Sequence, residues 1–176
     1  MTDSTSGAVE RAVEDVARTS YGRLVAYLAS VSGDLQSAED ALGDALLAAL
    51  TSWPERGVPD RPETWLVTAA RRKLVDAARR RDTAARSLPA LALLQAEQQA
   101  GPAPPAVPDK RLELLFACAH PVVAEAMRSP LMLQTVLGLD AARIAGAFLV
   151  PPTTMGQRLV RTKEKIRRTG VPFQVP

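Results

Sequence analysis

Hydrophobic positions recur at helical spacing along most of the chain. Valines and leucines between residues 9 and 31 predict a helix that is interrupted near Ser20 or Gly22. Residues 35–52 and 64–81 carry the same pattern and predict two further helices. Because the sequence is rich in alanine, leucine and arginine, with few β-branched runs, we expect an all-α protein.

Turn-forming residues indicate where these helices end. Residues 1–7 are small and polar and predict a frayed tail. We expect Trp53-Pro54 to end the second helix, because proline has no N–H to donate and crowds the preceding turn. The two prolines and one glycine of residues 55–63 predict a loop before the third helix.

A change of composition divides the chain into two helical parts. Residues 88–100 can form an isolated helix, whereas the following GPAPPAVP favours a semi-rigid spacer. We therefore expect one domain over residues 8–81, a Pro/Ala-rich linker over 82–109 and a second domain over 110–172.

The second domain begins with short helices. The pattern predicts one helix over residues 110–119 and a shorter one that ends at Met127. Another is expected to begin at Ser129-Pro130, with the serine as cap and the proline as first helical residue.

Residues 139–168 contain two short helical patterns joined by a compact turn. Pro151 and Pro152 end the first pattern, and Thr153 and Thr154 are expected to cap the second. The second pattern carries six basic residues against one acid. This layout is typical of a helix-turn-helix, whose second helix enters the major groove of DNA. An ordinary helical hairpin with a solvated basic face is the alternative.

Charge is segregated between the helices, although the formal net charge is only +3. The second half of the third helix, RRKLVDAARRR, has six basic residues against Asp76. The second helix is acidic; it would repel DNA and is expected to face a basic protein partner. Its acidic residues are Glu39, Asp40 and Asp44.

Few residues could support catalysis. The chain has one cysteine, Cys118, and one histidine, His120, which are too few ligands for a zinc site. A small buried residue beside a helix end explains Cys118 better than a reactive thiol. We therefore expect no enzyme, no metal and no cofactor. A single cysteine and the lack of a long apolar run predict a cytoplasmic protein without membrane contact.

Several motifs together resemble a bacterial RNA polymerase sigma factor of the extracytoplasmic-function type, with regions 2 and 4 only. GDLQSAEDALGDALLAAL resembles region 2.2, PETWLVTAARRKLVDAARRR resembles regions 2.3–2.4, and LGLDAARIAGAFLVPPTTMGQRLVRTKEKIR resembles region 4.2. LELLFACAHP resembles the subgroup that usually carries a C-terminal helical-repeat extension. We expect that extension to be absent here.

The resemblance implies a set of partners. Glu39, Asp40 and Asp44 would bind the clamp helices of the β′ subunit of core RNA polymerase. The loop before Trp65 would capture an unstacked base of the −10 element. The last helix would enter the −35 element. An anti-sigma factor or a separate regulatory domain is a further implied partner.

Named residues would contact promoter DNA, whereas Trp53 and Trp65 are expected in the core. In the last helix, arginine can read guanine and glutamine can read adenine. Implied near the −10 element are Arg56, Asp60, Arg61, Glu63, Thr64, Arg71, Arg72, Arg79 and Arg80; expected at the −35 element are Thr153, Thr154, Gln157, Arg158, Arg161 and Lys165.

Other functions remain as alternatives. A self-sufficient helix-turn-helix regulator would need neither the acidic second helix nor the basic third one. A helical interaction module would show no dependence on DNA. A small enzyme ranks last.

Overall fold

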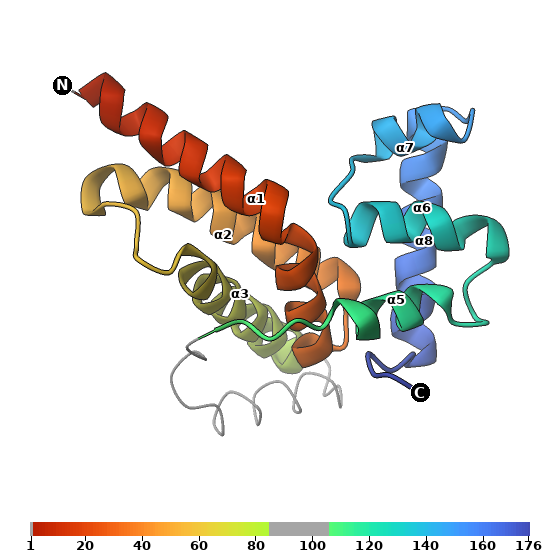
Figure 1. Ribbon diagram of the computed structural model, residues 1–176. Helices are drawn as coiled ribbons and strands as arrows, with labels where there is room; N and C mark the ends of the chain where they lie inside the picture. The colour runs from red at the N-terminus through yellow and green to blue at the C-terminus, as the bar shows by residue number, and fades with distance from the viewer. Residues whose placement is uncertain (1, 85–105) are drawn as a thin grey trace.

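The structure, a computed structural model, describes residues 2–84 and 106–176 (Figure 1). Within these residues the chain forms seven helices and no strand, which confirms the all-α class. The helices are α1 (Thr2–Ser32), α2 (Leu35–Arg56), α3 (Pro62–Ala84), α5 (Arg111–Ala119), α6 (Glu125–Thr135), α7 (Ala141–Ala147) and α8 (Pro152–Thr169).

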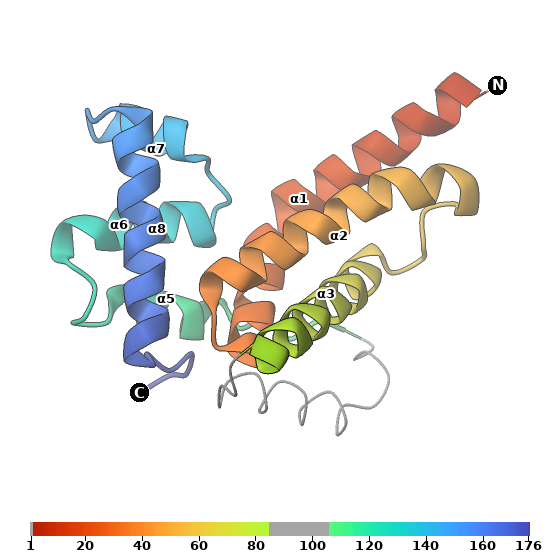
Figure 2. The ribbon, with the colours of Figure 1, turned by 180° about the vertical axis from the view of Figure 1, so that it is seen from behind.

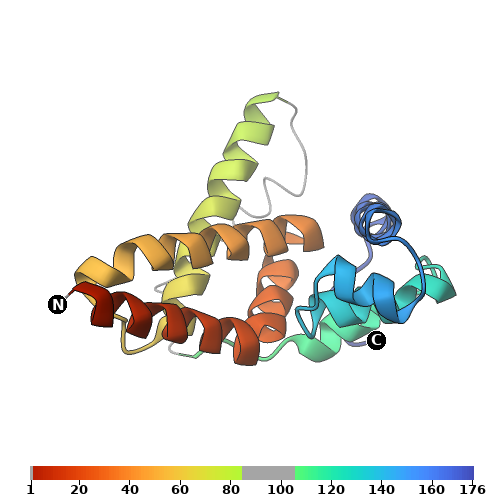
Figure 3. The same ribbon diagram turned by 90° about the horizontal axis from the view of Figure 1, so that it is seen from above.

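Helices α1, α2 and α3 pack together as the N-terminal body. In Figure 3, α1 and α2 run side by side and α3 crosses them. Their shared core is made of leucines, small alanines and one tryptophan, and burial of this apolar surface drives the packing. Its largest fully buried side chains are Leu24, Leu28, Leu35, Leu42, Trp53 and Leu66.

Helices α5 to α8 form the C-terminal body. Figure 2 shows α8 crossing α5 and α6, with α7 beside its N-terminal end. The apolar side of α8 faces inward at helical spacing through Met155, Leu159 and Ile166, which are each about 1% exposed. This packing leaves the opposite side of α8 in solvent.

The two bodies pack against each other. Helix α1 contacts α5 and α6, and α2 contacts α8. A Cβ atom on Gly22 would lie 2.1 Å from the carbonyl oxygen of Val136, so only glycine allows this approach. The expected break near Ser20 or Gly22 is therefore wrong. Helix α1 is continuous, and the glycine serves a contact between the bodies.

Two helix bounds in the N-terminal body differ from the sequence-based expectation. Helix α1 begins at Thr2, so the tail expected over residues 1–7 is helical from there on. Helix α2 continues past Trp53-Pro54 to Arg56. Pro54 is exposed and lies in the last turn of α2, where it costs one backbone hydrogen bond. Gly57 (φ 83°) ends the helix.

The C-terminal body differs at its prolines. Pro130 lies inside α6, so Ser129 does not begin a new helix there. Pro151 is the N-cap residue of α8 and Pro152 its first helical residue, so Thr153 and Thr154 lie in the first turn and are not caps. The helix expected over residues 88–100 lies outside the described residues.

Asp34 fixes the start of α2, and its replacement tests this cap. Its carboxylate accepts hydrogen bonds from the backbone N–H groups of Gln36 (3.1 Å) and Ser37 (3.3 Å). We expect Asp34→Ala to lower the free energy of unfolding by about 1 kcal/mol. Asp34→Asn should lower it much less, because asparagine also caps helices. Urea unfolding followed by tryptophan fluorescence measures this, because both tryptophans lie in the N-terminal body. Equal losses for both variants would contradict the capping role.

Candidate nucleic-acid interface

The loop between α2 and α3 borders a cavity of about 550 Å³. Arg56 ends α2, Gly57 turns the chain away, and Pro62 starts α3, so the loop residues and the first turns of α3 face the same space. The volume exceeds that of a single nucleobase. Five of the residues implied at the −10 element line it together: Arg56, Asp60, Arg61, Thr64 and Arg72.

A pair of tryptophans supports this cavity. Trp53 is 1% exposed, and the prediction that it belongs to the core is confirmed. The ring of Trp65 packs edge-on against it, with centroids 5.4 Å apart and planes at 71°. Trp65 is only partly buried and lines the cavity with Thr68, so the sequence-based assignment missed both residues. Helical spacing from Thr64 and Arg72 could have indicated Thr68.

Glu63 does not belong to this cavity. Its carboxylate accepts hydrogen bonds from Ser20 and from the guanidinium of Arg23, both on α1. The placement of Glu63 near a single strand stays a prediction, because its contacts in the structure are with α1. The residue ties the start of α3 to α1, and so positions the cavity rather than lining it.

Basic side chains continue from the cavity along α3. Arg72 and Arg79 are seven residues apart and lie on one face of the helix with Thr68. Arg80 is also exposed, and its Nε donates a hydrogen bond to the carbonyl oxygen of Asp76 (3.2 Å). Arg71 is half-buried and does not line the cavity. The result is a positive track that leads away from the cavity.

The outer side of α8 carries the residues expected at the −35 element. Asp140 caps α7 through the backbone N–H of Arg143 (2.8 Å), and the α7–α8 contacts hold α8 in place. A shallow depression on α8 also includes Gly156 and the 55% exposed Val160, which the sequence analysis did not select. Thr153, Gln157, Arg158, Arg161 and Lys165 are exposed, and Thr154 is half-buried.

The acidic residues of α2 divide into two kinds. Asp40 and Asp44 are exposed, whereas the side chain of Glu39 is 9% exposed and forms an ion pair with Lys163 of α8, itself 4% exposed. Burial raises the pKa of Glu39, and Lys163 offsets part of that rise. A basic group does face the acidic helix, but it comes from the same chain. Lys163 is one of the six basic residues expected away from the apolar side of the last helix, whereas the structure buries it.

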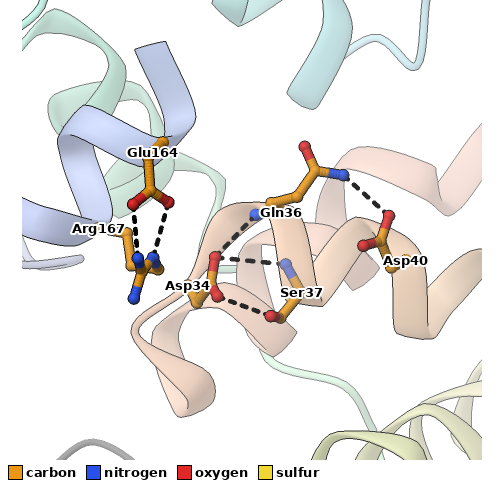
Figure 4. Close-up of a pocket in the computed structure, with 6 residues that line it drawn as sticks. All are labelled: Asp34, Gln36, Ser37, Asp40, Glu164 and Arg167. Carbon is orange, nitrogen blue, oxygen red and sulfur yellow. Dashed lines mark hydrogen bonds and ion pairs between the residues drawn. The ribbon is translucent and has the colours of Figure 1, made fainter. Parts of the chain in front are cut away.

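A groove lies next to this ion pair. Figure 4 shows the N-cap residue Asp34 and Gln36, Ser37 and Asp40 of α2 opposite Glu164 and Arg167 of α8. Nε of Arg167 donates to Glu164 (2.9 Å), and this bond lowers the pKa of the Glu164 carboxyl. The hydrogen bond to Glu164 raises the pKa of Arg167, and the charge of Asp34 adds to the rise. The edge of the interface between the bodies is therefore polar and electrostatically matched.

Cys118 and His120 do not form a catalytic pair. Cys118 is buried, with Sγ 3.6 Å from Oγ1 of Thr135. Nδ1 of His120 accepts the backbone N–H of Val122 (3.2 Å). Both residues support local structure. Among the residues that the structure describes, no three histidine, cysteine, aspartate or glutamate side chains are grouped to hold a metal, and no helix is long and apolar enough to cross a membrane.

Residues 16–84 match the family model of Sigma-70 region 2. The match covers the C-terminal half of α1 and all of α2 and α3. The chain is also 30% identical over 181 residues to an uncharacterized protein of Rhizobium meliloti (strain 1021). That alignment takes in 100% of this chain and 41% of the relative, so the chain spans less than half of the relative's length. No solved structure gives a significant match.

The reactivity of Cys118 tests its structural role. Burial raises the pKa of the thiol to about 11, so only about 0.1% of it is thiolate at pH 8. We expect a thiol reagent at pH 8 to modify the native chain at least about 100-fold more slowly than the urea-unfolded chain. Equal rates in the two states would indicate an accessible, activated cysteine.

Proposed function

We propose that this chain is a sigma factor of the extracytoplasmic-function type that binds core RNA polymerase and directs promoter recognition and transcription initiation. One observation carries the proposal. The residues that match Sigma-70 region 2 also contain the acidic face of α2, the cavity before α3 and the basic track along α3. We assign polymerase and −10 binding to residues 8–81, a linker to 82–109 and −35 binding to 110–172.

The exposed face of α2 supports docking on the β′ clamp helices. Asp40, Asp44 and Leu47 share one face by their spacing, and Leu47 is 64% exposed. An apolar side chain beside carboxylates provides both an anchor and charge complementarity to a basic partner. Glu39 belongs to the same proposed surface, but α8 covers it in this arrangement.

The cavity suits a base of the −10 element that has left the stack. Arg56, Asp60 and Thr64 offer donors and acceptors for the edge of a base, and Trp65 offers a ring. Extrusion is least costly where the duplex is already melting. Phosphates of the strand would follow the positive track, which supplies affinity without sequence choice. The arginines assigned to phosphates are Arg71, Arg72, Arg79 and Arg80, and Arg61 is assigned to the single strand.

The outer side of α8 suits the major groove of the −35 element. Arg158 and Arg161 can each bind a guanine with two hydrogen bonds, and Gln157 can bind an adenine in the same way. Thr153, Thr154 and Lys165 complete the surface. Control by an anti-sigma factor or by a separate regulatory domain is part of the same proposal.

Binding to purified core RNA polymerase, followed by transcription from a promoter library, tests the function. We expect core binding and promoter-dependent transcripts, which would also deliver the −10 and −35 sequences. Specific duplex binding without core binding would instead indicate a self-sufficient helix-turn-helix regulator.

Reversal of charge on α2 should abolish core binding. We expect the double variant Asp40→Arg, Asp44→Arg to lose affinity for core polymerase while the fold persists, because exposed charges contribute little to stability. The control is Glu14→Arg with Glu125→Arg, which makes the same charge change at exposed positions on α1 and α6. Unchanged affinity of the α2 variant in a titration against core would exclude this face as the docking surface.

Removal of one guanidinium from α8 should weaken the preference for a particular base at one position of the −35 element. We expect Arg158→Ala to cost roughly 1–3 kcal/mol of discrimination at one −35 position. A −35 library transcribed by the two proteins measures this, with Arg168→Ala as the control from the other end of the helix. If the preferred −35 sequence stays as sharply defined as before, α8 does not lie in the groove as proposed.

A further inference from the structure

The contact between the two bodies includes several residues that are sterically or electrostatically constrained. From the N-terminal body these are Tyr21, Gly22 and Glu39, and from the C-terminal body the Val136–Gly138 turn and Lys163; α1 also packs against α5. The ring of Tyr21 lies against Gly138, which has a φ of 67° and where a Cβ would be 2.9 Å from the ring. Each body therefore contributes a glycine where a larger residue would clash, which indicates a specific, sterically complementary contact.

Two opposite charges are buried at the centre of this contact. Glu39 and Lys163 are 9% and 4% exposed, and they are separated by 124 positions in the sequence. Neither side chain could remain charged at such burial without the other. The pairing therefore specifies one arrangement of the bodies, since a shift of α8 along α2 would leave two isolated charges out of water.

The pair leaves Glu39 incompletely satisfied. Its Oε2 contacts Lys163, whereas its buried Oε1 accepts no hydrogen bond from the described residues. Desolvation is the largest influence on this carboxyl and raises its pKa. A guanidinium can occupy both oxygens of a carboxylate, which one lysine here does not do. Glu39 can thus gain contacts by exchanging Lys163 for an arginine of a partner.

We propose that the packed arrangement is a closed state of the free chain, in which Lys163 of α8 occupies the polymerase-docking residue Glu39. The inference rests on the proposed function, because it takes Glu39 as part of the surface for core polymerase. Closing and docking compete for the same carboxylate. Polymerase binding releases Lys163 and separates α8 from α2. The C-terminal body, with the outer face of α8, then moves as a unit relative to the N-terminal body.

The ion pair is suited to such an exchange. A buried pair adds little net stability, because the attraction only offsets the loss of hydration of both ions. Opening returns both charges to water or to new partners together, so the closed state can be left without a stranded charge. Loss of one partner alone is different, since it strands the other in the interface and disfavours the closed state.

The test uses the full chain and compares Lys163→Met with Arg168→Met, which removes an exposed charge from the same helix. Lys163→Met leaves Glu39 buried without its partner, so we expect a larger radius of gyration in small-angle X-ray scattering. We expect its affinity for core polymerase to rise by on the order of tenfold, because apparent affinity scales with the competent fraction. Arg168→Met should match the wild type in both measurements.

A second variant opens the contact without altering charge. Gly22→Ala places a methyl group against the Val136 carbonyl, whereas Gly146→Ala, where a Cβ meets nothing within 4 Å, is its control. We expect Gly22→Ala to expand the chain and tighten core binding as Lys163→Met does. Tryptophan fluorescence verifies that the N-terminal body stays folded.

Two outcomes would overturn the proposal in different ways. If the wild type binds core, but both opening variants keep its radius of gyration and its affinity, the closed state is wrong and the proposed function stands. If no form of the chain binds core, the proposed function fails and the competition for Glu39 fails with it.

Discussion

The ion pair between Glu39 and Lys163 is the constraint on which the arrangement of this chain depends. Buried apolar residues of the two helical bodies belong to one continuous core cluster. Within this packing, one almost fully buried charge from each body must meet the other, which makes their relative position specific. The close contacts at Gly22 and Gly138 add a steric requirement, because a side chain at either position would clash with the other body. The interface is thus polar at its edge, and its buried ion pair favours one register of α8 on α2.

The same ion pair determines which surfaces of the molecule are open to a partner in the packed arrangement. The cavity before α3 and the outer side of α8 are open in the packed arrangement, because α8 turns its apolar side and Lys163 inward. The acidic face of α2 is partly closed, since Glu39 is covered while Asp40 and Asp44 are not. In the proposed function, polymerase docking is therefore more sensitive than DNA contact to how the bodies are packed.

Sequence patterns predicted the helices and the clustering of the loop arginines, and failed where a contact across the chain decided the outcome. The helical period of α2 and α3 is local, so it could be read directly, and so could the segregation of acids and bases. Lys163 looked solvated because its neighbours in sequence are basic; its buried partner lies 124 residues away. Gly22 looked like a helix break because only the position of Val136 explains it. Pro54 and Pro130 were taken as boundaries, but a helix tolerates proline where tertiary packing outweighs one lost hydrogen bond.

Trp65 shows how a residue can serve the core and a surface at once. Its edge-on contact with Trp53 ties α3 to α2, and the same ring closes one wall of the cavity. Because Trp53 holds the ring of Trp65, little side-chain entropy is lost at this wall when a ligand packs against it. The salt link of Glu63 to α1 acts in the same sense from the other side of α3. The packing of three helices therefore preorganises the cavity, whose polar residues come from the end of α2, the loop and the first three turns of α3.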